Sequence, residues 1–329
     1  MRVATHQRRS RRTISGIVIA LLALIVPLLG AAPASAAPRL DRIDWVTDRF
    51  AIVHVYSPSM NTVIANEVFL PANRGAASPS VYLLPGVDGG QEANSWFRST
   101  NLENFFANKH VKVVSPIGGR YSLYTDWQTD DPILGRNKWI TYLSHELPAV
   151  IDATFPSTGR NAVGGLSLSG AAALDLGIQA PGRFQAVASY SGCPRVSSPE
   201  SVATYAAVVA FGGGNVFNAF GPPTAPGWYE HDPSLNAERL RGKAIYLAAA
   251  SGIPGDRDFS TGLNPGLQAL GAGVIEGATG ACTAAFANQL GQMGIPHTYT
   301  RQDTGAHTWG LFEHQMRDSW RVLGPAIGA

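Results

Sequence analysis

Short apolar runs recur along the chain after residue 50, and glycine, proline and polar residues separate them. The runs are rich in β-branched residues, which is typical of buried strands. Segments with other patterns lie between many of them and predict helices. We expect strands at 51–55, 63–70, 81–84, 111–115, 161–164, 186–189, 244–249 and 298–301, and helices at 95–108, 138–154, 169–179, 283–293 and 311–322.

Strands and helices therefore alternate along most of the chain. Alternation of this kind predicts a mostly parallel central sheet that helices cover on both faces. Hydrophobic residues make up 45% of the chain and charged residues only 15%, against a usual charged fraction of about 25%, so a large core can form. No repeat, low-complexity tract or long linker follows Ala37, and we expect one α/β domain over residues 37–329.

The first 36 residues have a different pattern. They hold five arginines and no acidic residue, then an apolar run over residues 17–29, then the small residues Ala34-Ser35-Ala36. This order is that of a secretory signal peptide, and a membrane anchor would need about 20 apolar residues without the interruption at Pro27. We predict cleavage after Ala36 and a secreted protein, extracellular or associated with the cell wall. No later segment is expected to span a membrane.

Removal of this segment changes the charge. The rest of the chain carries 20 basic and 23 acidic residues, a net charge of −3, without a basic cluster of the kind that nucleic acid requires. The sequence therefore predicts no nucleic-acid partner.

Cys193 and Cys282 are the only cysteines. An oxidising compartment would allow them to form a disulfide, which we predict. Two thiols alone cannot make a zinc site, and the histidines have no paired spacing typical of metal ligands. We expect no metal and no cofactor.

The strongest local signal is the sequence NAVGGLSLSG at 161–170, a short strand that runs into a turn of small residues and then a helix. This context is typical of a nucleophile elbow, in which the serine occupies a strained strand-to-helix turn. Ser167 is the predicted nucleophile because Gly165 and Ser169, two residues to either side, are small. Ser169 is a rival with less suitable neighbours, Ser167 and Ala171.

A serine nucleophile requires a histidine base, which in this fold class follows the last strand. His307 lies in a turn just after the strand expected at 298–301, whereas His314 falls inside an expected helix and His297 at a strand edge.

The acid is less constrained by the sequence. Spacing favours Asp256, then Asp258, after the strand at 244–249, with Glu276 as a later candidate. Asp303 is too close to His307 in sequence to be preferred.

An oxyanion hole is expected from two backbone N–H groups. The N–H of Leu168, the residue after the nucleophile, is the first. The loop after the strand at 81–84 contributes the second, and Val87 is the predicted donor.

Further stretches match one known family in order along nearly the whole chain after the signal segment, and several of them have no role in a general esterase. They are SPSM at 57–60, YLL at 82–84, SLYTDW at 122–127, KWITYLSHELP at 138–148, GLSL at 165–168, GP at 221–222 with Trp228 and DP at 232–233, and GAHTW at 305–309. The sequence thus resembles the secreted mycolyltransferases of the antigen 85 complex, which have the α/β-hydrolase fold. The resemblance implies transfer of a mycolyl group from trehalose monomycolate through an acyl-serine to a second sugar hydroxyl.

The resemblance also changes the predicted acid. The family uses a glutamate about 30 residues before the histidine, at the start of a late helix, and Glu276 lies 31 residues before His307. Glu276 therefore moves above Asp256.

The resemblance has departures beside the nucleophile. The family's LLDG reads Leu83-Leu84-Pro85-Gly86 here, and Asp88 replaces the arginine that follows. The two lost charged residues help to hold trehalose in the family. We therefore expect other residues to contact the sugar here. We expect Asp88, Asn94, Trp96 and Trp309 to line its site.

The leading hypothesis is acyl transfer in cell-envelope assembly by Ser167, with His307 as general base and then acid and Glu276 orienting the imidazole. The expected partners are a glycolipid acyl donor, a sugar or other alcohol acceptor, and the cell-envelope surface. One alternative is a secreted esterase or lipase that hydrolyses lipid or sugar esters. Another is a non-catalytic wall-binding or adhesion protein, since a fold can persist without its activity.

Overall fold

The structure is a computed structural model that describes residues 1–2, 37–91, 94–258 and 269–329. The chain divides into two units, 1–36 and 37–329, and the account below concerns the second. The predicted signal peptide lies almost wholly outside the described residues and stays a prediction.

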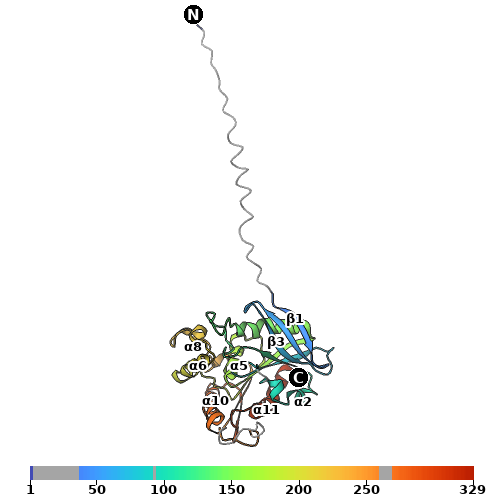
Figure 1. Ribbon diagram of the computed structural model, residues 1–329, viewed down its shortest axis with the longest axis vertical. Helices are drawn as coiled ribbons and strands as arrows, with labels where there is room; N and C mark the ends of the chain where they lie inside the picture. Colours follow the sequence, from blue (N-terminus) through green and yellow to red (C-terminus); the bar gives the residue numbers. More distant parts are fainter. Residues whose placement is uncertain (3–36, 92–93, 259–268) are drawn as a thin grey trace. The chain divides into compact units, whose positions relative to one another are not determined.

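A nine-stranded sheet forms the centre of this unit, in the order β1-β2-β3-β5-β4-β6-β7-β8-β9. The first three strands pair antiparallel, as do β3 and β5, and every later neighbour pairs parallel. Figure 1 shows β1 and β3 at one end of the domain and α10 and α11 at the other. The strands are β1 (Arg39–Trp45), β2 (Phe50–Ser57), β3 (Thr62–Phe69), β4 (Ser78–Leu84), β5 (Lys112–Ile117), β6 (Ser157–Leu166), β7 (Ala186–Tyr190), β8 (Ala244–Ala250) and β9 (Thr298–Gln302).

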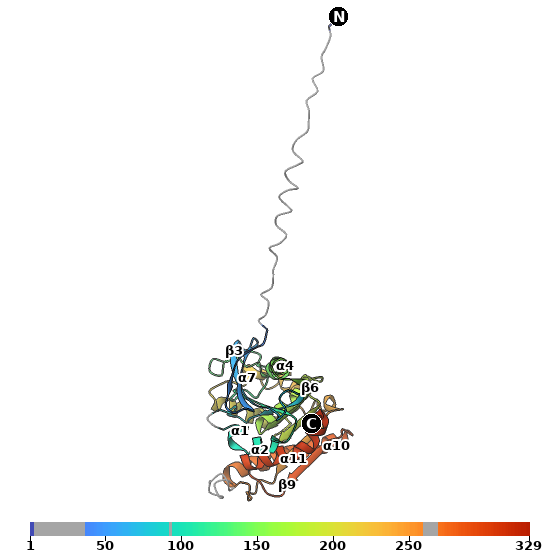
Figure 2. The ribbon, with the colours of Figure 1, turned by 90° about the vertical axis from the view of Figure 1, so that its right-hand side faces the viewer.

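Helices cover both faces of the sheet, each burying an apolar stripe against it. One core cluster joins the sheet to α4, α5 and α10, and a second joins the opposite face to α1, α2 and α11; Figure 2 shows α1, α2 and α11 together, away from α4. These helices are α1 (Trp96–Ser99), α2 (Leu102–Phe106), α4 (Leu147–Thr154), α5 (Leu168–Gln179), α10 (Val274–Gln292) and α11 (Trp309–Ile327). The shorter elements are α3 (Trp139–Thr141), α6 (Pro199–Phe211), α7 (Phe217–Phe220), α8 (Pro226–Glu230), the π-helical turns η1 (Tyr142–Glu146) and η4 (Ala269–Gly273), and the 3-10 turn η2 (Ala237–Leu240).

The predicted α/β-hydrolase fold is confirmed, and all eight predicted strands are present. The sequence pattern missed β1, because this edge strand is polar and mostly exposed, and it missed α6 to α8. The helix expected at 283–293 begins at Val274, because alanine and glycine give its first turns no apolar periodicity.

The expectation that no later segment spans a membrane stays a prediction. By length and composition alone, the segment Leu270–Gln292 is long and apolar enough to cross a membrane. Buried core helices share these properties, and α10 packs against β8 while its buried residues Phe286 and Leu290 join the main core.

Cys193 and Cys282 form a disulfide, with Cα atoms 5.2 Å apart. It joins the loop after β7 to the middle of α10. Beside it, the hydroxyl of Thr283 donates a 2.6 Å hydrogen bond to the carbonyl of Gly192. These two links fix α10 against the carboxyl end of the sheet.

Replacing both cysteines with serine should lower the free energy of unfolding by up to ~4–5 kcal/mol, because the bond closes a loop of 89 residues and so restricts the unfolded chain. Urea unfolding of the oxidised protein and of Cys193→Ser/Cys282→Ser measures the difference. Two titratable thiols in the unfolded, unreduced protein would contradict the bond.

Candidate active site

Ser167 occupies the tight turn between β6 and α5, with φ 57° and ψ −129°. A non-glycine residue is strained at positive φ, and such strain is characteristic of functional sites. A Cβ on Gly165 would lie 2.0 Å from the carbonyl oxygen of Ser169, so only glycine fits two residues before the turn. This geometry is that of the elbow expected from the sequence.

Ser169 is fully buried. Its hydroxyl donates to the carbonyl of Leu166 at 2.8 Å and lies 3.2 Å from that of Leu84. The rival serine thus acts inside the turn and does not face an opening.

His307 links Ser167 to a carboxylate. Its Nε2 lies 2.8 Å from the Ser167 hydroxyl and its Nδ1 lies 2.8 Å from Oε2 of Glu276. The imidazole is mostly buried and the Glu276 side chain is fully buried. The structure therefore brings together the predicted nucleophile and base with the acid that the family resemblance implied.

The second oxygen of Glu276 is also occupied. Oε1 accepts a 2.7 Å hydrogen bond from the Ala250 N–H and a 2.8 Å bond from the Ser191 hydroxyl. The Gln315 amide in turn donates to the Ser191 hydroxyl at 2.9 Å. A buried carboxylate needs such donors, and they orient its other oxygen toward His307.

Sequence reasoning did not find Ser191 or Gln315. Ser191 follows directly after β7 and has φ 50°. A polar residue at the carboxyl end of a parallel strand is the signal that could have identified it, because ligand and catalytic groups collect at that edge of an α/β sheet.

The other candidate acids lie elsewhere. Asp256 and Asp303 are exposed, whereas Asp258 is fully buried and accepts hydrogen bonds from the Ala306 N–H at 3.0 Å and the Thr308 hydroxyl at 2.6 Å. Asp258 thus fixes the loop that carries His307 without contacting the imidazole in any described hydrogen bond. The spacing-based first choice, Asp256, has no such contact with His307 either.

Two other histidines are also remote from this chain of hydrogen bonds. The His297 ring lies against its own turn, 2.9 Å from the Ile295 carbonyl. His314 lies inside α11, where burial lowers its pKa.

The sequence predicts an oxyanion hole from the N–H groups of Leu168 and Val87. Leu168 is the first residue of α5, where N–H groups lack a helical acceptor. The carbonyl of Val87 accepts a 2.9 Å bond from the Tyr121 N–H. Across the part of the chain that the structure describes, neither the Leu168 N–H nor the Val87 N–H donates a hydrogen bond outside the helices and strands, so both are free for a ligand.

Three of the predicted substrate-contacting residues form one chain. Asn94 donates to the carboxylate of Asp88 and accepts from the indole N–H of Trp309, and Asp88 also accepts from the Gly90 N–H at 3.2 Å. This chain connects the loop after β4 to the loop after β9, which carries His307.

Trp96 differs from the expectation. It is fully buried, and its indole N–H donates to the Leu84 carbonyl at 3.0 Å. Its ring packs edge-on against Trp309, 5.4 Å between centroids. Trp96 therefore supports Trp309 from beneath and has no exposed surface for a substrate.

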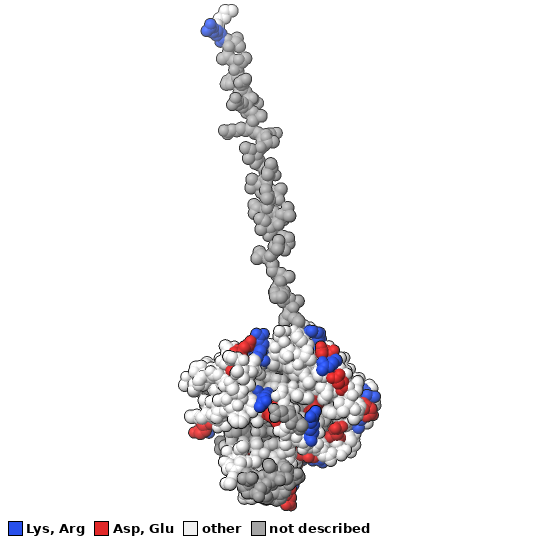
Figure 3. Space-filling model, in the orientation of Figure 1, with Lys and Arg blue, Asp and Glu red and all other residues white. Residues whose placement is uncertain are grey.

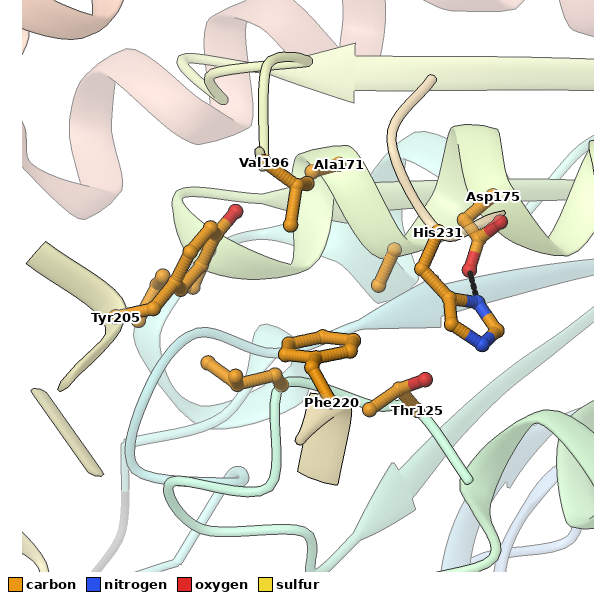
Figure 4. A pocket seen from close by; sticks show the side chains of 10 residues that line it. Thr125, Ala171, Asp175, Val196, Tyr205, Phe220 and His231 are labelled. Carbon is orange, nitrogen blue, oxygen red and sulfur yellow. Dashed lines mark hydrogen bonds and ion pairs between the residues drawn. The ribbon is translucent and has the colours of Figure 1, made fainter. Parts of the chain in front are cut away.

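A small cavity of ≈ 20 Å³ lies behind Leu168, among apolar side chains and a His231–Asp175 pair joined at 2.8 Å (Figure 4). Burial alone would lower the pKa of His231, but the hydrogen bond and charge of Asp175 outweigh it and the pKa is raised. The cavity has room for about one water molecule and none for a substrate.

A larger open groove of ≈ 540 Å³ lies at the carboxyl end of β5. Gln91, Arg120, Met60, Ile133 and Trp139 are among the residues that line it. The loop after β4 borders it through Gln91, so the groove adjoins the segment that carries Val87 and Asp88.

No group of three or more His, Cys, Asp or Glu residues within the described ranges could hold a metal ion.

Comparison with known proteins adds to this geometry. The family model described as "Putative esterase" matches residues 57–322. The chain is 28% identical to the diacylglycerol acyltransferase/mycolyltransferase Ag85A of Mycobacterium leprae, over 97% of this chain and 94% of that protein. It is 29% identical to Ag85B of Mycolicibacterium smegmatis, over 93% of this chain and 95% of that protein.

Among solved structures, Mycobacterium tuberculosis MPT51 (FbpC1) matches with a TM-score of 0.72 and 26% identity, over 85% of this chain and all of that one. An S-formylglutathione hydrolase from Agrobacterium tumefaciens shares the fold. It matches with a TM-score of 0.62 and 16% identity, over 88% of this chain and all of that one. The resemblance to the antigen 85 mycolyltransferases is confirmed, and the comparisons support the acyltransferase class.

Ser167→Ala should abolish labelling by a serine-reactive phosphonate, because losing a triad member commonly costs several orders of magnitude in rate. Ser169→Ala should keep the label and lower stability, since it leaves two buried carbonyl contacts unmade. Intact mass spectrometry after phosphonate treatment measures both. Full labelling of Ser167→Ala would remove Ser167 from the mechanism.

Glu276→Gln should lower turnover far more than Asp256→Asn, because a neutral amide no longer supports a charged, correctly oriented imidazole. Steady-state rates on a short-chain ester compare the two variants. The opposite order would favour the acid chosen from spacing.

Proposed function

The chain belongs to the putative esterase family, and we propose that it is a secreted serine acyltransferase that moves a long-chain, mycolyl-type acyl group from a trehalose ester to a hydroxyl acceptor. The observation that carries the proposal is the continuous chain Ser167–His307–Glu276, with both links at 2.8 Å. The similarity to acyltransferases along nearly the whole chain supports the choice of reaction.

In the first half-reaction, Ser167 Oγ attacks the ester carbonyl carbon while His307 Nε2 accepts its proton. The tetrahedral intermediate carries a negative oxygen, which the N–H groups of Leu168 and Val87 are free to stabilise. Collapse breaks the bond to the sugar oxygen, which takes the proton from His307. An acyl-Ser167 ester and a free sugar hydroxyl result.

The second half-reaction is the same sequence in reverse with a new alcohol. His307 takes the proton of the acceptor hydroxyl, whose oxygen attacks the acyl carbon, and Ser167 Oγ leaves with the proton returned by His307. The imidazole is positively charged in both intermediates. The buried Glu276 carboxylate beside it stabilises that charge.

The groove supports a large substrate. It adjoins the end of β5 and the start of β3, while Ser167 follows β6, three strands from β3 in the sheet order. Strands lie about 4.8 Å apart, so along this edge the groove reaches from about 10 Å (at β5) to about 14 Å (at β3) from the strand that carries the nucleophile. A sugar ester with a long acyl group spans such a distance, whereas a small ester would leave the groove unused.

The acceptor site differs from the pattern of the mycolyltransferases that the sequence resembles. Asp88 accepts two hydrogen bonds from its own loop and Asn94, and an ionised carboxylate cannot donate to a sugar hydroxyl. Pro85 is buried and has neither an N–H nor a polar side chain. Contacts to trehalose therefore have to come from Asn94, Trp309 or groups further from the nucleophile.

The decisive experiment is the intact mass of the chain after incubation with trehalose monomycolate, with Ser167→Ala as control. We expect an added mycolyl mass on the wild-type chain alone. Rapid loss of that mass in water without a sugar product would favour an esterase. The absence of both acylation and phosphonate labelling would favour a non-catalytic wall-binding protein.

The selectivity for trehalose over simpler acceptors should be lower here than in a relative that keeps the aspartate and the arginine. If each lost contact contributes ~1 kcal/mol, the selectivity ratio should fall at least about tenfold. Competition between paired acceptors for one acyl donor measures the preference. Strong trehalose selectivity that stays unchanged in Pro85→Asp would refute this expectation.

A further inference from the structure

The turn η4 and the start of α10 expose bulky apolar side chains to solvent. Leu270 is 79% exposed, Val274 64% and Ile275 51%. Ile253, in the loop after β8, is 63% exposed. We call these four residues the α10 apolar edge.

The rest of the exposed face of α10 is uncharged. Beyond Val274 the exposed positions Ala278, Ala281 and Ala285 follow at intervals of four, three and four residues, so they lie on one face of the helix. The only charged residue of the segment Leu270–Gln292 is Glu276, which is buried. An ordinary surface helix carries charged residues on its solvent face, whereas the exposed positions of α10 carry none and its exposed polar residues, Asn288 and Gln292, lie toward its C-terminal end.

This edge adjoins the proposed catalytic groups. Ala272, between Leu270 and Val274, accepts a 3.3 Å hydrogen bond from the His307 N–H. The carbonyl of Ile253 accepts a 2.7 Å bond from the Gly305 N–H, two residues before His307. Whatever rests on the α10 apolar edge therefore lies beside the imidazole loop.

The charge distribution agrees with an uncharged partner. Figure 3 shows most lysine, arginine, aspartate and glutamate side chains over the upper and right-hand parts of this face, and α10 itself carries no exposed charge. An anionic surface would require a basic cluster, which α10 lacks.

The size of the edge argues against a second copy of the chain. The segment from Leu270 to Ala285 is about 22 Å long at 1.5 Å per residue, and one helix face about 10 Å wide gives roughly 220 Å². A stable protein interface needs about 800 Å² on each partner. A lipid layer requires no such minimum buried area, because its fluid acyl chains adapt to a small apolar patch.

We propose that the α10 apolar edge docks on an uncharged lipid surface and holds the mouth of the site against the layer that supplies the acyl donor. The identity of that donor rests on the proposed function, but the docking does not. Docking would shorten the path of an acyl ester from the layer to Ser167, because the same helix carries Glu276.

The test is flotation of residues 37–329, a compact unit of their own, with vesicles of phosphatidylcholine, which has no net charge. Leu270→Gln/Val274→Gln removes two apolar side chains and keeps good helix formers. The matched control is Val46→Gln/Leu235→Gln, which removes two side chains of similar exposure, 60% each, outside α10. Thermal unfolding of all three proteins reports whether they remain folded.

We expect the wild-type chain and the control to float with the vesicles. The α10 variant should bind the vesicles at least ~10-fold more weakly, as expected for the loss of two partly buried aliphatic side chains. Equal binding by both variants, or no binding by the wild type, would overturn the proposal. Binding confined to anionic vesicles and released by salt would overturn it in favour of an electrostatic attachment. A dimer in sedimentation that is lost only in the α10 variant would assign the edge to a second copy.

Phosphonate labelling of Ser167, measured without vesicles, separates this proposal from the proposed function. Labelling without flotation leaves the acyltransferase proposal standing and removes the docking. Flotation without labelling would support the docking and remove the acyltransferase proposal.

Discussion

A buried carboxyl group organises the candidate active site. The Glu276 carboxylate is fully buried, and a charge without partners in that position would cost several kcal/mol. Its partners come from three separate parts of the chain: the end of β8 through Ala250, the residue after β7 through Ser191, and the loop after β9 through His307. The carboxyl ends of three neighbouring strands are thereby held in one arrangement around a single side chain.

The nucleophile depends on a second constraint, which is steric. Close packing surrounds the turn at Ser167, since a Cβ on Gly165 would lie 2.0 Å from the Ser169 carbonyl oxygen and one on Gly170 would lie 2.5 Å from the Ser189 hydroxyl of β7. The Ser167 N–H donates to the Tyr190 carbonyl of the neighbouring strand β7 at 2.9 Å. Since Ser191 follows Tyr190 and its hydroxyl donates to Glu276, the two ends of the proposed triad are tied to adjacent residues at the carboxyl end of β7.

Much of this arrangement could be predicted because local signals agree with the fold. Alternating strands and helices indicated the parallel sheet, the small residues around Ser167 indicated the elbow, and chain order indicated His307. The acid could not be derived from spacing, because Asp256, Asp258 and Glu276 all follow β8 at plausible distances, and a resemblance was needed to choose among them. The role of Asp258 in holding the His307 loop depends on tertiary contacts that leave no pattern in the sequence.

The helix that carries the acid, α10, has a low intrinsic helix propensity around Glu276. Glycine costs about 1 kcal/mol relative to alanine inside a helix, and α10 contains Gly277 and Gly280 within two turns of Glu276. Close packing requires Gly280, since a Cβ there would lie 2.7 Å from the Ala250 carbonyl oxygen, and that approach brings Glu276 within reach of the Ala250 N–H. The uncharged outer face adds no ion pairs between successive turns. The position of Glu276 therefore depends on the Cys193–Cys282 bond, the Thr283 hydrogen bond and the buried face of α10 more than on helix propensity.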